Sequence, residues 1–153
     1  NHETTQLILS QIKKSINQDS QILDLGSGSG ILSIAAIKYG AKHVTCIEYD
    51  RDCEDNFFYN MKLNNISTGY TLLFKDVLSI TDFDYDFIVA NINKKIIIQL
   101  LPNIKKFRTK KCKVILSGLL KNDENELMNL INQLGFYFIE STTKGEWVCL
   151  VIE

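Results

Sequence analysis

The sequence predicts a doubly wound α/β fold on a seven-stranded, mainly parallel sheet. Short apolar runs of strand length alternate along the chain with segments of helical periodicity, an order typical of a parallel sheet covered by helices on both faces. The last two predicted strands are joined by a short connection, so they should add a C-terminal antiparallel hairpin strand. Because 153 residues is the size of a single domain, we expect one Rossmann-like domain over residues 1–153.

Each predicted element follows from a local pattern. The chain opens with a helix in which Ile8, Leu9, Ile12 and Ile16 share one face, and Thr4 or Thr5 is its expected N-cap. The predicted strands are the apolar runs at 22–25, 44–48, 70–74, 87–90, 113–116, 136–140 and 146–152. The other predicted helices follow the first, second, fourth and fifth strands: 31–39 closed by Gly40, about 50–63, 94–107 kinked or divided at Pro102, and 124–134 closed by Gly135. Residues 142–145 are the expected hairpin connection.

Composition and charge exclude several classes of protein. The chain is 45% hydrophobic and 23% charged with a net charge of −1, so it is not a polycation built to bind nucleic acid, and no direct nucleic-acid contact is expected. It has neither an apolar run long enough to span a membrane nor a signal-peptide pattern. The four cysteines are scattered, which favours separate thiols in a reducing cytoplasm over disulfides or a zinc site.

A glycine-rich stretch, 24–30, joins the first apolar strand to the following helix and reads Asp-Leu-Gly-Ser-Gly-Ser-Gly. Glycines let the backbone turn tightly and let a ligand approach it, and the helix N-terminus offers free N–H groups. The dinucleotide fingerprint would require its third glycine at position 31, where Ile31 stands. With glycines at 26, 28 and 30 and an acid two residues earlier, the stretch resembles the first motif of class I S-adenosylmethionine (SAM) methyltransferases.

Three further acids are placed to contact such a ligand. Glu48 ends the second strand 18 residues after Gly30, close to the spacing of about 20 expected for an acid that binds both ribose hydroxyls, and the alternative is a surface acid ending a strand. Asp24 is expected to fix the glycine loop through its N–H groups or to reach the ligand's ammonium through water, unless it is a purely structural hinge. Asp76 is a candidate acceptor for the adenine amine, against a simple turn aspartate. Asp50 is expected to cap a helix.

Asn91, at the end of the fourth strand, is the candidate catalytic residue. Its amide oxygen can accept a hydrogen bond from a substrate N–H and hold the nitrogen lone pair toward a methyl group, whereas the alternative is a turn asparagine. No nucleophile–base pair or metal-ligand spacing stands out, and methyl transfer from a sulfonium needs neither. The basic residues between Lys94 and Lys113 are interpreted as a solvated face, with a docking surface as the minority alternative.

Five pieces of sequence together resemble the catalytic domain of ribosomal protein L11 methyltransferases, and they span nearly the whole chain. The glycine motif is shared by the wider superfamily, whereas the opening His-Glu-Thr-Thr, the Ser-Gly of the fifth strand and the closing Gly-Glu-Trp are far more particular. The matching residues are His2-Glu3-Thr4-Thr5, Asp24 to Leu32, Val89-Ala90-Asn91-Ile92, Leu116 to Leu120 and Gly145-Glu146-Trp147-Val148.

The resemblance implies SAM-dependent methylation of protein amines, which leaves S-adenosylhomocysteine (SAH) as the product. It implies ribosomal protein L11 as the partner and a segment at Thr4-Thr5 that closes over the cofactor. The expected cofactor contacts are Thr4, Thr5, Asp24, Gly26, Ser27, Gly28, Gly30, Ile31, Glu48, Tyr49, Asp76, Val77 and Asn91.

Two features depart from the family pattern. Members commonly carry Asp where Glu48 stands, and they have an N-terminal substrate-recognition domain that we expect to be absent from this chain. The alternatives are therefore a methyltransferase for another protein lysine, for RNA or for a small molecule, and a non-catalytic SAM-binding module. A nicotinamide oxidoreductase is disfavoured by Ile31.

Overall fold

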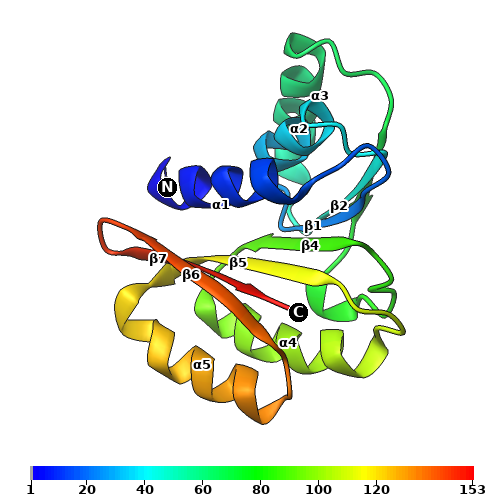
Figure 1. Ribbon diagram of the computed structural model, residues 1–153. Coiled ribbons are helices and arrows are strands. Elements are labelled where there is room, and N and C mark those ends of the chain that lie inside the picture. Colours follow the sequence, from blue (N-terminus) through cyan, green and yellow to red (C-terminus); the bar gives the residue numbers. More distant parts are fainter. Residues whose placement is uncertain (1) are drawn as a thin grey trace.

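The computed structural model describes residues 2–153 and confirms the doubly wound α/β architecture (Figure 1). Seven strands form one sheet in the order β3-β2-β1-β4-β5-β7-β6. The first five strands pair in parallel, and β7 pairs antiparallel with both β5 and β6. The strands are β1 (Gln21–Leu25), β2 (His43–Glu48), β3 (Tyr70–Phe74), β4 (Phe87–Asn91), β5 (Lys113–Leu120), β6 (Phe138–Lys144) and β7 (Trp147–Ile152).

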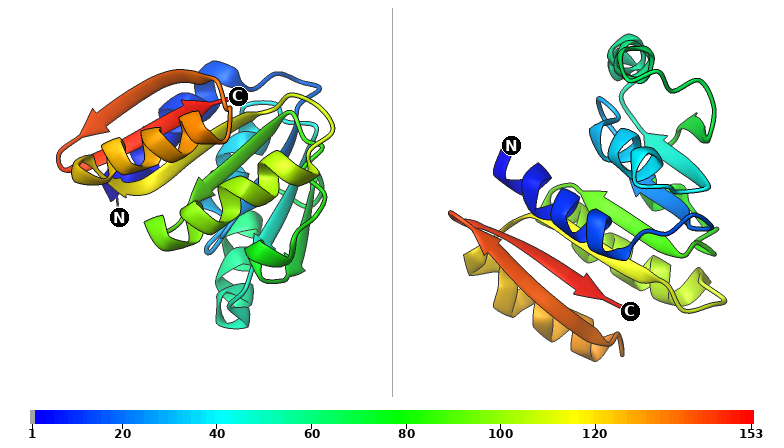
Figure 2. Two further views of the ribbon diagram at one scale, coloured as in Figure 1. Left: turned by 90° about the horizontal axis from the view of Figure 1, so that it is seen from below. Right: turned by 45° about the horizontal axis from the view of Figure 1, so that its top comes forward.

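Helices cover both faces of the sheet, as Figures 1 and 2 show. One face carries α1, α2 and α3, and the other carries α4 and α5. Each face buries its own apolar cluster, and strand residues alternate between the two because successive side chains point to opposite sides. The helices are α1 (His2–Ser15), α2 (Ile31–Lys38), α3 (Glu54–Leu63), α4 (Lys94–Phe107) and α5 (Glu124–Gln133).

The register of the parallel strands aligns their carboxyl ends at one edge of the sheet, called the carboxyl edge below. Leu25 pairs with both Ile47 and Ala90, and Asn91 pairs with Ser117. The opposite edge, where these strands begin, is called the amino edge. Ligands of doubly wound sheets bind beyond the carboxyl ends of the strands, so the carboxyl edge is the side on which a site is expected.

Several predicted boundaries were wrong. Thr4 and Thr5 lie inside α1, so neither is its N-cap, and the buried face of α1 is Thr4, Leu7, Ile8, Gln11 and Ile12. Strand β6 continues through Lys144, so the hairpin turn is Gly145–Glu146, and β5 extends beyond Leu116 to Leu120. Helix α4 is not divided at Pro102. The proline faces solvent, so water can donate to the carbonyl oxygen four residues earlier, which lacks its usual N–H partner.

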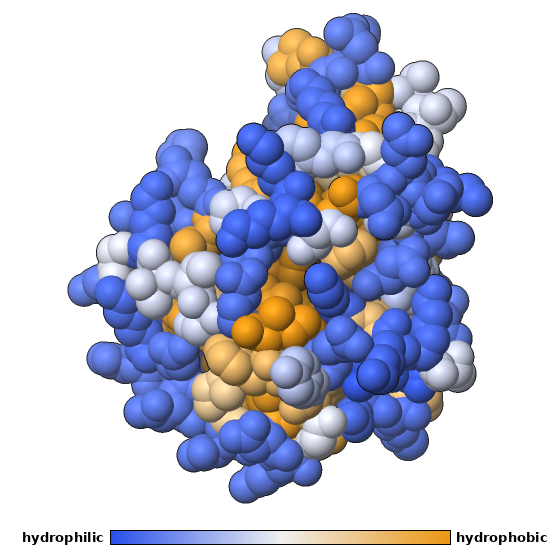
Figure 3. All heavy atoms as spheres, viewed as in Figure 1, coloured by the Kyte–Doolittle hydropathy of each residue, from blue (hydrophilic) through white to orange (hydrophobic). Residues whose placement is uncertain are grey.

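Other local expectations are confirmed. Gly40 and Gly135 follow the ends of α2 and α5 with φ of 101° and 71°, the left-handed conformation that ends helices, and Asp50 caps the short 3₁₀ turn before α3 by accepting from the Asp52 N–H. On the face shown in Figure 3, hydrophilic residues dominate, with apolar residues in the middle and on the projecting end where α3 lies. Among the described residues, no helix is long and apolar enough to cross a bilayer.

Candidate active site

The glycine loop after β1 is closely packed at its two ends and open in its middle. Gly26, Gly28 and Gly30 all have positive φ, and a Cβ atom added at Gly26 or Gly30 would lie within 3 Å of Ile92 or Phe57. A Cβ at Gly28 would meet no atom within 4 Å. The backbone at Gly28 therefore faces open space at the carboxyl edge, where a ligand can approach it.

Glu48 ties this loop to the end of β2. Its Oε2 accepts the Gly28 N–H at 2.7 Å, and its Oε1 accepts the Tyr49 and Asp50 N–H groups at 2.8 and 2.9 Å. Because an ionised carboxylate has about four acceptor positions, one remains for a ligand hydroxyl while the three backbone bonds are kept. The side chain thus orders the loop, and with these three bonds kept it can accept from one of the two ribose hydroxyls, so ribose binding by Glu48 stays a prediction.

One of the two expectations for Asp24, that it fixes the glycine loop by accepting from the loop N–H groups, was wrong. The Gly26 and Ser27 N–H groups donate to the Ile47 carbonyl at 2.8 and 3.0 Å, and Gly28 donates to Glu48. Asp24 is instead buried at the end of β1, where its Oδ2 accepts from the Ser33 hydroxyl at 2.5 Å. Burial, reinforced by the nearby Glu48 charge, raises the pKa of Asp24 to about 6.

Two buried oxygens beside the loop have no hydrogen-bond partner among the described residues. They are Oδ1 of Asp24 and Oγ of Ser27. A buried acceptor without a donor costs roughly 1–3 kcal/mol, so such atoms call for a partner outside the protein. A ligand ammonium has three N–H donors, enough for both oxygens. The expected contact of Asp24 with such a group, through water, stays a prediction.

Asp76 and Val77 lie just beyond β3 and begin a short 3₁₀ turn. The Asp76 Oδ1 accepts the Leu78 N–H at 2.9 Å, which is the turn role expected as the alternative, and adenine recognition by Asp76 stays a prediction. The Val77 side chain is buried in the core cluster beneath α4, so contact with a ligand would have to come from its backbone. Ile31 and Tyr49, in contrast, are 48% and 77% exposed beside the loop.

The start of α1 reaches the same edge from the other side. The Ser117 hydroxyl in β5 donates to the Thr4 carbonyl at 3.4 Å, and a Cβ at Gly145 would lie 2.9 Å from the Glu3 carboxylate. Three of the sequence motifs, which are far apart in the chain, are therefore in mutual contact. Thr4 is buried and Thr5 is half-buried, and Ser117, which donates to the Thr4 carbonyl, is the sheet partner of Asn91.

Asn91 is the last residue of β4, half-exposed and paired with Ser117. The next residue, Ile92, was not predicted as a site residue. Its Cγ2 atom and its carbonyl group fill the space beside Gly26 and Gly118. A lone isoleucine after a strand gives no chemical signal in the sequence, although both Ile92 and the Ser-Gly pair in β5 belong to the pieces that carry the family resemblance.

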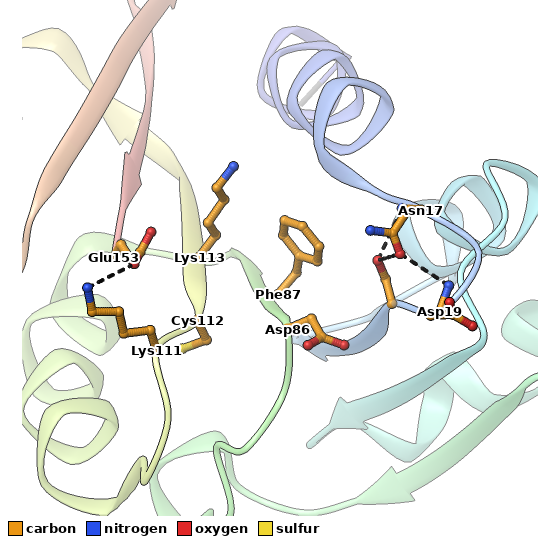
Figure 4. A pocket seen from close by; sticks show the side chains of 9 residues that line it. Asn17, Asp19, Asp86, Phe87, Lys111, Cys112, Lys113 and Glu153 are labelled. Carbon is orange, nitrogen blue, oxygen red and sulfur yellow. Dashed lines mark hydrogen bonds and ion pairs between the residues drawn. The ribbon is translucent and has the colours of Figure 1, made fainter.

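A hollow of about 430 Å³ lies at the opposite, amino edge (Figure 4). Two of its charged groups, Lys111 and Glu153, pair with each other at 3.8 Å (Figure 4). A third, Asp86, pairs at 3.5 Å with Lys110, which lies outside the lining. None of the predicted site residues lines it. The lining residues are Asn17, Asp19, Ser20, Asp86, Phe87, Lys111, Cys112, Lys113 and Glu153.

Comparison with known proteins decides the family. The family model described as ribosomal protein L11 methyltransferase (PrmA) matches residues 1–153. The chain belongs to this family. Its fold is accordingly that of the class I SAM-dependent methyltransferases.

Individual relatives agree with the family assignment. The chain is 34% identical over 150 residues to a ribosomal protein L11 methyltransferase of Clostridium perfringens, covering 98% of this chain and 48% of that protein. The crystal structure of a ribosomal protein L11 methylase from Lactobacillus delbrueckii subsp. bulgaricus superposes with a TM-score of 0.92 at 31% identity, over 100% of this chain and 79% of that one. The chain thus spans about half the length of the curated relatives it matches.

A more distant structure shares the fold alone. Magnesium protoporphyrin IX methyltransferase from Synechocystis, solved with bound SAM, has a TM-score of 0.76 at 13% identity, over 97% of this chain and 76% of that one.

Proposed function

We propose that residues 1–153 form the catalytic domain of a SAM-dependent methyltransferase that acts on protein amines, with ribosomal protein L11 as the substrate. The observation that supports SAM as the cofactor is the pair of unpartnered buried oxygens, Asp24 Oδ1 and Ser27 Oγ, beside a glycine loop open at Gly28. Membership of the ribosomal protein L11 methyltransferase family supports L11 as the methyl acceptor. A cytoplasmic protein without membrane or direct nucleic-acid contacts is part of the same proposal.

Each residue around the loop has a distinct task in holding the cofactor. Asp24 and Ser27 accept hydrogen bonds from its ammonium group, Glu48 accepts from a ribose hydroxyl, and Asp76 accepts from the adenine amine. Ile31 and Tyr49 supply apolar contact, because both are exposed beside the loop. When bound, the cofactor supplies a methyl group on a positively charged sulfur.

Asn91 handles the acceptor amine. An ammonium has no lone pair and is repelled by the sulfonium, so the amine must arrive neutral or lose its proton to water first. The Asn91 side-chain oxygen then accepts an N–H of the neutral amine and aims its lone pair at the methyl group for in-line displacement. No dedicated general base is required in this scheme, because the sulfide is a good leaving group.

The first test is calorimetric titration of the chain with SAH, with NADH as the control. We expect binding of SAH alone, and failure to bind SAH would overturn the cofactor assignment. Transfer of radiolabelled methyl from SAM to purified ribosomal protein L11 then tests the acceptor. SAH binding without transfer to L11 would redirect the search to another protein lysine, RNA or a small molecule.

The role of Asn91 is tested by Asn91→Ala, with the exposed helix residue in Asn132→Ala as the matched control. We expect Asn91→Ala to keep SAH affinity and to lose at least 100-fold in turnover, since orientation of the amine is lost. The control should keep both. Unchanged turnover in Asn91→Ala would remove this residue from the mechanism.

A further inference from the structure

Ile92, directly after Asn91, is enclosed between two glycines from distant parts of the chain. A Cβ atom at Gly26 in the cofactor loop would lie 2.5 Å from the Ile92 Cγ2 atom. A Cβ atom at Gly118 in β5 would lie 2.5 Å from the Ile92 carbonyl oxygen and 3.1 Å from its carbonyl carbon. Neither glycine position therefore accepts even a methyl group without displacing Ile92, which touches the loop with its side chain and β5 with its backbone.

The residues on either side of Ile92 are anchored as well. Asn91 is paired with Ser117 in the sheet. Asn93 caps α4, because its side-chain oxygen accepts the Ile96 N–H at 3.1 Å. Lys94 Nζ lies 2.9 Å from Asp123 and 2.8 Å from Glu126. Four consecutive residues are thus each held by a different contact, although this segment leaves the sheet.

The irregularity in β5 makes this enclosure possible. The pairing of β5 with β7 shifts between Leu116 and Leu119, and Gly118 has φ of 80°. A strand that bulges at this point directs its backbone differently from a regular strand, and only glycine adopts that φ without strain. Ser117, next to it, holds the Thr4 carbonyl of α1. The Ser-Gly pair therefore contacts both the start of α1 and the segment after β4.

We propose that Ile92 and Gly118 are positioning residues that fix Asn91 relative to the cofactor loop. The inference rests on the proposed function, in which Asn91 holds the acceptor amine. Reacting atoms must approach within about 3–3.5 Å in line, and a displacement of about 1 Å can cost about 100-fold in rate. A rigid link from the loop that carries the cofactor to the residue that holds the amine keeps that distance.

The decisive variant is Gly118→Ala, with Gly69→Ala as its matched control. Both glycines have similar positive φ, 80° and 86°, so both substitutions place alanine in the left-handed region, but a Cβ at Gly69 would meet nothing closer than 4.0 Å. We expect Gly118→Ala to lower kcat for L11 methylation about 100-fold while SAH affinity changes less than about threefold. Gly69→Ala should change neither by more than about twofold. Equal losses of kcat and SAH affinity in Gly118→Ala would overturn the proposal.

Substitutions of Ile92 test the side-chain contact without changing a glycine. Ile92→Val keeps the Cγ2 atom that faces Gly26, and Ile92→Ala removes it. We expect kcat to fall about tenfold in Ile92→Ala and to stay within about twofold in Ile92→Val, with SAH affinity unchanged in both. Wild-type kcat in Ile92→Ala would overturn the role of Ile92, even if Gly118→Ala proved too unstable to purify.

A readout without turnover separates this inference from the proposed function. In the SAH complex, the side-chain amide resonances of Asn91 should shift in Gly118→Ala and Ile92→Ala, and they should stay in place in Ile92→Val and Gly69→Ala. Unshifted Asn91 resonances in all four variants would refute the positioning role. If the wild-type chain transfers no methyl to L11, the proposed acceptor fails, but these resonances still decide whether Ile92 and Gly118 hold Asn91.

Discussion

The two carboxylates beside the glycine loop have different partners from those of the hollow at the amino edge. At the amino edge, Asp86 and Glu153 lie near Lys110 and Lys111, so positive and negative charges largely cancel. At the carboxyl edge, Glu48 bonds to backbone N–H groups and Asp24 to a hydroxyl. Within residues 2–153, neither of these two acids has an ion pair with a lysine or arginine.

The difference concerns which carboxylates have no positively charged side chain beside them. An acid that is fixed by backbone dipoles stays in place without a neutralising side chain, so its field remains available to an incoming cation. A charged pair on the surface offers no such field and contributes little to stability. The contrast favours the carboxyl edge as the site for a cofactor that carries both a sulfonium and an ammonium group, even though the hollow in Figure 4 lies at the other edge.

The largest expected effect comes from removing the carboxylate in Glu48→Ala. The variant loses the bond to Gly28 N–H that orders the loop and the acceptor proposed for a ribose hydroxyl, and each hydrogen bond to a charged group contributes about 1.5–3 kcal/mol. We expect SAH affinity to fall about 1,000-fold by calorimetry. Asp86→Ala, at the amino edge, is the control and should bind SAH like the wild type. Equal affinities in the two variants would abolish the distinction between the edges.

A smaller effect, on stability, is expected from Asp24→Asn. The pKa of Asp24 is about 6 in the folded chain against 3.8 for an ordinary aspartate, so the folded state favours the protonated form. The wild-type chain without cofactor should therefore lose up to about 3 kcal/mol of unfolding free energy from this group as the pH rises from about 4 through 6.

The amide in Asp24→Asn does not titrate, so this part of the pH dependence should vanish while SAH affinity falls. Urea unfolding at a series of pH values measures the first effect, and calorimetry measures the second. An identical pH dependence in variant and wild type would show that Asp24 does not carry the buried charge.

The smallest effect is expected from Lys111→Ala at the amino edge. The Lys111 side chain is 88% exposed and lies 3.8 Å from Glu153, a geometry in which ion pairs contribute well under about 1 kcal/mol. The free energy of unfolding, measured by thermal denaturation, should change by less than about 0.5 kcal/mol, and SAH affinity should not change. A large loss of affinity would place a ligand in the hollow of Figure 4 and reverse the comparison.

The sequence was a good guide to what depends on periodicity and strand order. Alternating apolar runs predicted the sheet, and strand ends predicted that the glycine loop, Glu48, Asp76 and Asn91 share one edge. It was a poor guide to which group bonds to which. Glu48 bonds to the loop because its side chain reaches from the end of β2 to the residues after β1, whereas Asp24 bonds to Ser33. No local sequence pattern encodes such contacts.

Long-range packing explains the remaining differences. The enclosure of Ile92 depends on a bulge in β5, and the length of β6 depends on its pairing with β7 as far as Lys144 and Trp147. The face of α1 includes buried Thr4 and Gln11 because these polar side chains lie against the sheet, where Gln11 donates to Thr142. Hydrophobic periodicity ignores such polar contacts, so it predicted a face displaced toward Leu9 and Ile16.

The position of α1 has a consequence for how the domain is assembled. This helix precedes all seven strands in the chain, yet it packs on β5, β6 and β7, and its bond from Gln11 to Thr142 spans 131 residues. The apolar face of α1 is therefore not fully packed until the hairpin of β6 and β7 has been synthesised. Contacts between residues so far apart in the sequence raise the contact order, and a high contact order slows folding. During that interval Leu7, Ile8 and Ile12 lack the contacts that β5, β6 and β7 supply, and exposed apolar surface of this kind favours aggregation of the nascent chain.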